Sequence, residues 1–293
     1  MAERISFHDQ ISRNKWKSFF LLVGIFIVFI VLGVAIGFAM GPDYFLIIMV
    51  VAIIISLIYI VAGYYNSDKI ALASVKAKLA SGSKYPQYHH SVEGLCLASG
   101  LPKPRLYVME NSQINAFASG RSPEKAVICV TTGALEKLDK QELEGVIGHE
   151  LSHIANYDIR YMTLVTVLVG MVAIISEIFL RSLWFRSGNS NDNKNGIFLL
   201  IGIVLAILAP IVVYFVQMSI SRKREFSADA SAVKFTRYPE GLIKALKKIG
   251  GDNIKEKKKI SKAVAPMFFT NPFKGAGSTH PPISKRISKL ERM

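Results

Sequence analysis

The sequence predicts an α-helical membrane protein with four transmembrane helices and an α+β domain that contains a small β-sheet. The chain of 293 residues is 51% hydrophobic, with a mean hydropathy of +0.34. Its apolar residues are concentrated in four long runs, which is typical of membrane-spanning segments. Two short segments of strand composition also stand directly before a capped amphipathic helix, which predicts the mixed domain.

Each of the four runs is long enough to cross the core of a bilayer, which takes about 20 residues. They are Ser18 to Met40, Tyr44 to Tyr65, Met162 to Leu180 and Ile197 to Met218. The first is too long for the apolar part of a signal sequence. The third, which contains Glu177, is also compatible with a re-entrant element that covers the functional site. The chain then divides into a hairpin (1–66), a polar part (67–161), a second hairpin (162–220) and a second polar part (221–293).

The net charge of +15 is distributed unevenly. The first polar part carries 11 basic and 10 acidic residues, whereas the segment from Ser221 onward carries 18 basic and 6 acidic ones. Basic residues gather on the cytoplasmic side of membrane proteins, so we expect both polar parts and both termini to be cytoplasmic. The basic segment leaves the membrane directly, which favours anionic lipid headgroups over nucleic acid as its partner.

The pentapeptide His149-Glu150-Leu151-Ser152-His153 has the H-E-x-x-H pattern. Residues four apart share one face of a helix, so both imidazoles can bind one metal ion. Zinc accepts neutral imidazole and carboxylate ligands in a tetrahedral shell and keeps one position open for water. Glu150 lies beside the two histidines, where it can polarise that water as a general base.

The context of the pentapeptide predicts that it lies on a helix. Asp139 and Glu142 form a capping box, and the apolar residues that follow recur at helical spacing. A surface helix that carries two histidines by chance is the alternative interpretation. The helical context, which a metal-binding H-E-x-x-H motif requires, argues against that alternative.

A third protein ligand is needed, because catalytic zinc usually has three. Glu225 is the best candidate, and Asp229 lies one turn further on the same helix face. A carboxylate in that position can accept the free N–H of a ligand histidine and fix its tautomer. The alternative is that Glu225 pairs with Arg222 or Arg224 on a solvated helix.

Other segments predict elements around the site. The segments 105–109 and 126–131 have strand composition, and Asn115, Ala116, Phe117 and Ala118 lie between them. An edge strand there would bind an extended peptide by strand addition, or these residues are simply sheet core. Ser67 and Asp68 favour a helix that runs to Lys78. In the loop 275–282, His280 is a candidate for stabilising an oxyanion, assisted by Arg286.

Gly33, Gly37 and Gly41 recur every four residues at the end of the first apolar run. This spacing permits close helix packing. It serves packing within one chain as readily as dimerisation.

Together these features resemble the HtpX-type membrane zinc metalloproteases, which are related to the Ste-type CAAX prenyl proteases and the Oma-type mitochondrial proteases. The resemblance covers nearly the whole chain. It rests on the apolar runs, the segment 115–118, the H-E-x-x-H motif with Asn156 and Asp158, Glu225 with Asp229, and the segment 278–282 with Arg286. The prenyl proteases have more membrane spans, which argues against their specialised role here.

The resemblance implies an α+β zincin-like (gluzincin) metalloprotease domain, with one zinc ion on His149, His153 and Glu225 and with Glu150 as general base. It also implies that a bacterial or archaeal membrane holds the protein. There it would cleave misfolded or surplus membrane proteins at the cytoplasmic face, as part of quality control and the stress response. A zinc-stabilised scaffold without proteolysis is the alternative, but such inactive relatives typically lack the acid that Glu150 supplies. A transporter is disfavoured, since the chain has no clear repeat.

Overall fold

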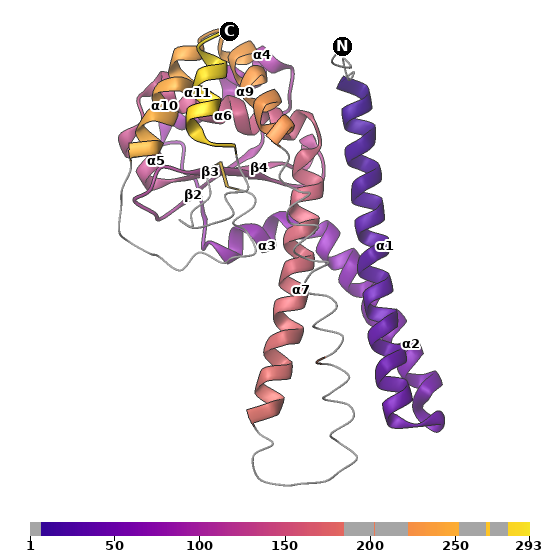
Figure 1. The fold of residues 1–293 in the computed structure, drawn as a ribbon. Coiled ribbons are helices and arrows are strands. Elements are labelled where there is room, and N and C mark those ends of the chain that lie inside the picture. The colour runs from indigo at the N-terminus through magenta and orange to yellow at the C-terminus, as the bar shows by residue number, and fades with distance from the viewer. Residues whose placement is uncertain (1–6, 185–201, 203–221, 252–267, 270–280) are drawn as a thin grey trace.

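The computed structural model describes residues 7–184, 202, 222–251, 268–269 and 281–293. A globular part, which holds the sheet and the shorter helices, lies above a stalk of long helices (Figure 1). The stalk consists of α1 (Phe7–Met40), α2 (Pro42–Tyr65) and α7 (Asp158–Trp184). The fourth apolar run, 197–218, falls almost entirely outside the described residues.

Helices α1 and α2 form a tight antiparallel hairpin. Gly41 joins them with a φ of 102°, which a residue with a side chain rarely adopts, and Pro42 begins α2. A Cβ atom at Gly33 would lie 2.6 Å from the Cβ of Ala52, and one at Gly37 would lie 2.7 Å from the ring of Phe45. In the described structure, the glycine spacing therefore serves packing within the chain.

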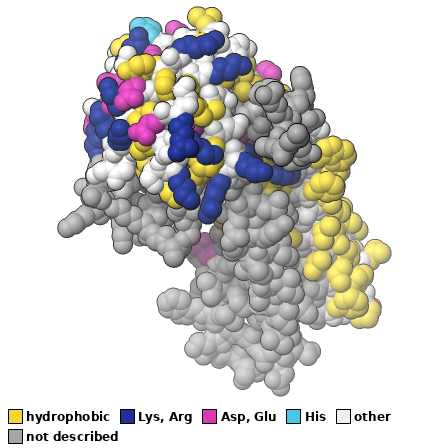
Figure 2. Space-filling model, turned by 45° about the horizontal axis from the view of Figure 1, so that its top comes forward, with side chains coloured by type: hydrophobic (Ala, Val, Ile, Leu, Met, Phe, Trp, Pro, Cys, Tyr) yellow, Lys and Arg dark blue, Asp and Glu magenta, His cyan; other side chains and the backbone are white. Residues whose placement is uncertain are grey.

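Where its residues are described, the hairpin of α1 and α2 exposes many apolar side chains, and hydrophobic side chains run along one edge of the view in Figure 2. Among the described residues, α1 and α2 are the two helices long and apolar enough to cross a membrane. Leu46, Ile47 and Ile58 of α2 are more than half exposed, and a continuous apolar surface of this kind is unstable in water but suits lipid.

The third apolar run begins inside α7, which continues without interruption through Trp184. A helix of this length, at 1.5 Å per residue, is about 40 Å long. It packs on the hairpin through Leu21, Ile25, Leu164 and Leu168, and the hydroxyl of Tyr59 donates to the Val167 carbonyl at 2.9 Å. That α7 crosses the bilayer stays a prediction.

The sheet has four strands in the order β1-β2-β4-β3. They are β1 (Lys78–Leu79), β2 (Arg105–Met109), β3 (Ala116–Ser119) and β4 (Val127–Thr131). Strands β2 and β4 are parallel, whereas β1 and β3 pair antiparallel at the two ends of the sheet. The two predicted strands are confirmed to within one residue. The predicted helix from Ser67 to Lys78 is wrong at its end, because α3 (Ser67–Ser74) stops early and Lys78 pairs in β1.

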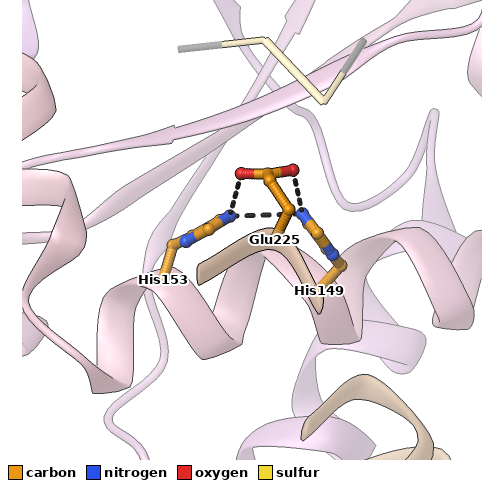
Figure 3. Close-up of side chains that lie close together, drawn as sticks. All are labelled: His149, His153 and Glu225. Carbon is orange, nitrogen blue, oxygen red and sulfur yellow. Dashed lines mark hydrogen bonds and ion pairs between the residues drawn. The ribbon is translucent and has the colours of Figure 1, made fainter. Parts of the chain in front are cut away.

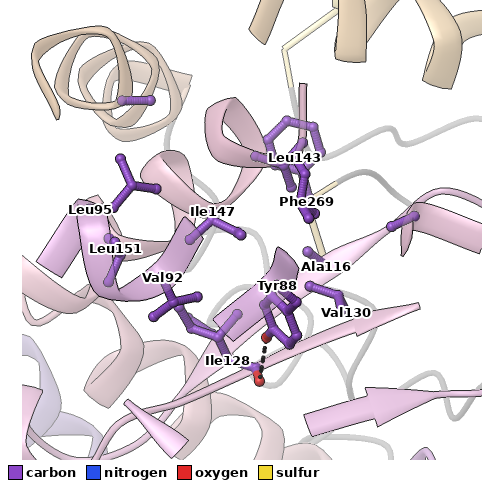
Figure 4. Close-up of a cluster of buried hydrophobic side chains, with 14 of the residues drawn as sticks. Tyr88, Val92, Leu95, Ala116, Ile128, Val130, Leu143, Ile147, Leu151 and Phe269 are labelled. Atoms are coloured by element: carbon purple, nitrogen blue, oxygen red, sulfur yellow. Dashed lines mark hydrogen bonds between the residues drawn. The ribbon is translucent and has the colours of Figure 1, made fainter. Parts of the chain in front are cut away.

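Helices cover one face of the sheet. They are α4 (Pro86–Ser99), α5 (Thr132–Lys137), α6 (Lys140–Ala155), α9 (Arg222–Thr236), α10 (Pro239–Gly251) and α11 (Ile283–Leu290), and the short 3-10 helix η1 (Pro123–Lys125) precedes β4. The main core lies between the sheet and α4 and α6 (Figure 4). Leu143, Ile147 and Leu151 line one face of α6 in this core, because their spacing places them on one side of the helix.

The opposite face of α6 lets two other helices approach closely. A Cβ atom at Gly145 would lie 2.8 Å from the backbone of Leu242 in α10, and one at Gly148 would lie 3.3 Å from Ala232 in α9. Side chains at these two positions would push the helices apart. The glycines therefore allow α9 to pack directly on the helix that carries the H-E-x-x-H motif.

Candidate metal centre

Helix α6 holds the motif in a fixed orientation. Its first turn carries the predicted capping box, in which Asp139 and Glu142 each accept a hydrogen bond of 2.9 Å from the backbone N–H of the other. Lys248 of α10 adds an ion pair of 2.6 Å to Glu142. His149, Glu150 and His153 follow on the buried part of the helix, with exposed fractions of 1%, 2% and 6%.

The structure brings His149, His153 and Glu225 together (Figure 3). Each offers one ligand atom, and these atoms all lie within 4.8 Å of one another. The two Nε2 atoms are 3.2 Å apart, and each lies 3.6 Å from an oxygen of Glu225. Glu225 reaches this position because α9 packs across α6, as the glycines of α6 permit.

These residues fit a zinc ion. A carboxylate lies beside the Nδ1 atom of each histidine. Nδ1 of His149 is 2.9 Å from Oδ1 of Asp229, and Nδ1 of His153 is 3.0 Å from Oδ2 of Asp158. The Nδ1 atoms therefore carry protons, and both Nε2 atoms direct their lone pairs toward one point. Two such lone pairs repel unless a proton or a metal cation lies between them. Nitrogens bound to a tetrahedral zinc ion are about 3.3 Å apart, close to the distance found here.

Asp229 is itself held by Arg286 of α11. The guanidinium donates from Nε to Oδ2 at 2.9 Å and from Nη2 to Oδ1 at 2.6 Å. Burial raises the pKa of Asp229, but Arg286 and His149 outweigh it and hold the pKa below its usual value. The sequence predicted Asp229 as the partner of a ligand histidine, and in the structure its Oδ1 atom lies 2.9 Å from Nδ1 of His149. Arg286 lies on the Nδ1 side of His149, where it supports Asp229, and its Nη1 atom is 4.0 Å from Oε2 of Glu225. Its predicted assistance to an oxyanion stays a prediction.

Sequence reasoning assigned no role to Asn14, named Asp158 only as part of the resemblance, and gave Arg224 only as an alternative partner of Glu225. Asp158 is the partner of His153, and its Oδ1 accepts hydrogen bonds from Arg224 at 3.2 Å and from Asn14 at 2.8 Å. The position of Asp158, just past the end of the motif helix, was an available signal. Nothing in the local sequence distinguishes Asn14, which lies more than 140 residues from its partners.

Glu150 lies near the outer edge of β3, on the side away from β4. The backbone of Ala118 lies close enough to the Glu150 carboxylate to favour its charged form. Ala116 and Ala118 point their backbone groups to the same edge, because alternate residues of a strand do so. At this edge the Ala116 carbonyl accepts the N–H of Phe269 at 2.8 Å, and Phe117 pairs with Phe268.

The predicted substrate segment is thus an edge strand beside the motif, with part of that edge paired to the chain itself. Asn115 is buried, and its side chain accepts the N–H of Ala116 at 3.0 Å, which orders the start of the strand. His280 and most of its predicted loop lie outside the described residues.

A proton would compete with a bound metal ion for His149. Burial and Arg286 lower its pKa, but hydrogen bonds to Asp229 and Glu225 outweigh them and raise the pKa from 6.5 to about 9. Below that pH, the metal must displace a proton. We therefore expect zinc affinity to rise about tenfold per pH unit from 6.5 to about 9.

Zinc titration against a chelator of known pH dependence measures this effect. An affinity that is the same at pH 7 and pH 8.5 would contradict the assignment of the proton to His149. By the same linkage, protonation of His149 stabilises the zinc-free fold fully below pH 6.5, and this contribution is lost as the pH rises through about 9.

Comparison with known proteins agrees with this geometry. Residues 83–293 match peptidase family M48. The chain belongs to this family. A protein of Listeria monocytogenes serotype 4a named "Protease HtpX homolog" is 40% identical, over 97% of this chain and 99% of its own length. Another of that name, from Caldanaerobacter subterraneus, is 46% identical over 78% of this chain and 79% of its own.

The fold also resembles that of S. mikatae Ste24p, with a TM-score of 0.50 and 19% identity over 92% of this chain. The chain spans 62% of the length of Ste24p, and the likeness concerns the fold alone. The M48 chain described here is a membrane metalloprotease with relatives of the HtpX type, as its sequence predicted. Its fold is mostly helical, with a small mixed sheet.

Proposed function

We propose that this chain is a membrane-integrated, zinc-dependent endopeptidase that cuts misfolded or surplus membrane proteins at the cytoplasmic face of a bacterial or archaeal membrane. One observation carries the proposal. His149, His153 and Glu225 converge on one point, with Glu150 buried next to them on α6. In this assignment His149, His153 and Glu225 hold one zinc ion.

The chain's own residues supply the proton transfers. When bound, zinc supplies Lewis-acid polarisation of the scissile carbonyl and makes water a stronger acid. Glu150 accepts a proton from the attacking water as its oxygen bonds to the carbonyl carbon. The C–N bond then breaks, and Glu150 delivers the proton to the leaving amine. Burial and the Glu225 carboxylate raise the pKa of Glu150, which brings the base nearer to neutral pH.

The edge of β3 orients the substrate in this proposal. A peptide in extended conformation adds to the edge beside Ala118, where backbone groups face the motif helix. Asn115, Ala116 and Phe117 precede Ala118 in the predicted substrate segment, and the edge at Ala116 and Phe117 is paired with Phe269 and Phe268 in this structure. His280 remains the predicted oxyanion donor, and Arg286 acts by holding Asp229.

The substrate class follows from the position of the motif. Helix α6 ends at Ala155 and α7 begins at Asp158, so the candidate zinc site lies a few helical turns from the apolar stalk. The distribution of basic residues favours the cytoplasmic side. A protease in this position reaches unfolded segments next to the bilayer, as quality control under stress requires.

A test compares two forms of one substrate. Wild-type protein in lipid vesicles is given an unfolded segment attached to a membrane span, and the same segment as a soluble fragment. We expect faster cleavage of the attached form. Equal rates would contradict the membrane-protein preference, and no cleavage of either form would contradict the endopeptidase itself.

Anionic lipid headgroups are the proposed membrane partner. The basic segment predicted to meet these headgroups begins at Ser221, and its part from Lys255 to Lys259 lies outside the described residues. A cleft of about 400 Å³ at the end of α2 is also rich in positive charge, because five basic and two acidic side chains line it. The guanidinium of Arg121 lies 4.3 Å from the ring centre of Tyr65, the last residue of α2. Aromatic and basic residues at this level of a span are typical of the headgroup region.

We therefore expect activity in vesicles to depend on anionic lipid through this cleft. The double variant Lys69→Gln with Lys125→Gln should reduce the rate gain of anionic over neutral vesicles by at least about twofold, because each basic residue contributes about 1 kcal/mol near such a surface. Lys84→Gln is the matched control, since Lys84 lies away from the cleft. An unchanged gain in the double variant would exclude this cleft.

A further inference from the structure

A buried asparagine lies near the start of the first apolar helix. Asn14 of α1 is 2% exposed and lies four residues before the first predicted membrane run, which begins at Ser18. A buried side-chain amide costs free energy unless its groups are hydrogen-bonded. The partners of Asn14 therefore show what this residue does.

Both hydrogen bonds from the Asn14 amide nitrogen reach the turn that follows the motif helix. Nδ2 donates to Oδ1 of Asp158 at 2.8 Å and to the carbonyl of Asn156 at 3.0 Å. An amide NH₂ has two donors, and both are used here. The other oxygen of Asp158, Oδ2, lies 3.0 Å from Nδ1 of His153. An unbroken series of hydrogen bonds thus runs from α1 through Asp158 to the imidazole of His153.

The turn itself needs external support. Tyr157, between Asn156 and Asp158, has a φ of 57°, a conformation that costs free energy for a residue with a side chain. Besides the two bonds from Asn14, Lys15 places its ammonium 4.8 Å from the ring centre of Tyr157. Helix α1 therefore contacts all three residues of the turn, including the Asp158 carboxylate.

Asp158 is held from a second direction by α9. Arg224, next to Glu225, donates to the same Oδ1 at 3.2 Å. Asp158 thus receives bonds from the membrane helix and from the helix that carries the third candidate ligand. Arg224 supplies positive charge, whereas Asn14 supplies a neutral donor and the direct link to α1.

We propose that Asn14 is a positioning residue of the metal centre, through which the first membrane helix orients Asp158 and, in turn, His153. The inference rests on the proposed zinc site. It means that the catalytic domain does not complete its metal site alone, because part of the support for a ligand comes from the membrane anchor. Partners behind metal ligands typically change metal affinity or activity 10–100-fold when they are lost.

The test uses the full chain in detergent. Asn14→Leu keeps a similar volume and removes both donors. We expect zinc affinity, measured by chelator competition, to fall about tenfold. At saturating zinc, kcat should fall while KM stays within about twofold, because the substrate edge at β3 is untouched. The visible absorption of the cobalt-loaded protein should also change, since it reports the geometry of the ligands.

Ser18→Ala is the matched control, one turn further on the same buried face of α1. Ser18 donates only within its helix, to the Asn14 carbonyl at 2.9 Å. We expect this variant to bind zinc as the wild type does. Should Asn14→Leu fail to fold, Asn14→Ala gives the same comparison. Equal zinc affinity and equal kcat in the Asn14 variant and the wild type would overturn the proposal.

A double variant tests the route through Asp158. In an Asp158→Asn background, Asn14→Leu should have little further effect on zinc affinity, because the link is already broken. A full additional loss would show that Asn14 acts by another route and would overturn the proposal. Failure of the proposed function is distinguishable, because the wild type itself would then bind no zinc.

Discussion

Replacing Glu150 by Gln is expected to lower kcat by about 10²–10⁴-fold while zinc remains bound. The amide has nearly the same shape as the carboxylate but cannot accept the proton from water. Glu150 is not one of the three candidate ligands, whose atoms converge without it. The loss should therefore appear in turnover, and zinc affinity should stay within a few-fold of the wild-type value.

The measurement is cleavage of an unfolded model protein by purified chain, with zinc content determined on the same samples. Glu144→Gln is a suitable control, because Glu144 lies on the same helix and its side chain is 25% exposed. A Glu150→Gln variant that cuts at the wild-type rate would exclude Glu150 as the base. A variant that loses zinc as well as activity would instead make Glu150 part of the metal site.

Replacing Arg286 by Met is expected to destabilise the zinc-free protein by about 3–5 kcal/mol. Arg286 is 1% exposed, and its guanidinium forms two hydrogen bonds to Asp229. It also lies 4.4 Å from the ring centre of Phe269. Met fills a similar space, but the Asp229 charge then stays buried without its main partner, which is the costly case for a buried ion pair.

The midpoint of thermal unfolding in detergent should fall by on the order of 10 °C. The double variant Arg286→Met with Asp229→Asn removes both charges, and we expect it to recover much of this loss. A single variant as stable as the wild type would show that the pair contributes little. Equal loss in single and double variants would assign the effect to packing around Phe269.

Structural features that depend on neighbouring residues in the sequence were predicted correctly. The capping box at Asp139 and the strands around residues 105–109 and 127–131 depend on neighbours a few residues away. The helix predicted to reach Lys78 failed, because Lys78 pairs with Val108 in the sheet, and that long-range pairing outweighs local helix preference.

The same contrast applies to the candidate site. The sequence by itself determined that His149, Glu150 and His153 share a helix face, since a 3.6-residue period requires it. It also indicated Glu225 and Asp229 by their spacing. Only the tertiary structure decided that Arg286 supports Asp229 and that Phe269 pairs with the β3 edge.

Asn14 shows the physical reason most plainly. A polar residue at the start of an apolar helix has the same local pattern whether it faces lipid headgroups or a buried carboxylate. The packing of α1 against α7, through Leu21 and Leu164, turns this residue toward Asp158. Contacts between segments so far apart depend on how whole helices pack, and no short-range pattern in the sequence records that.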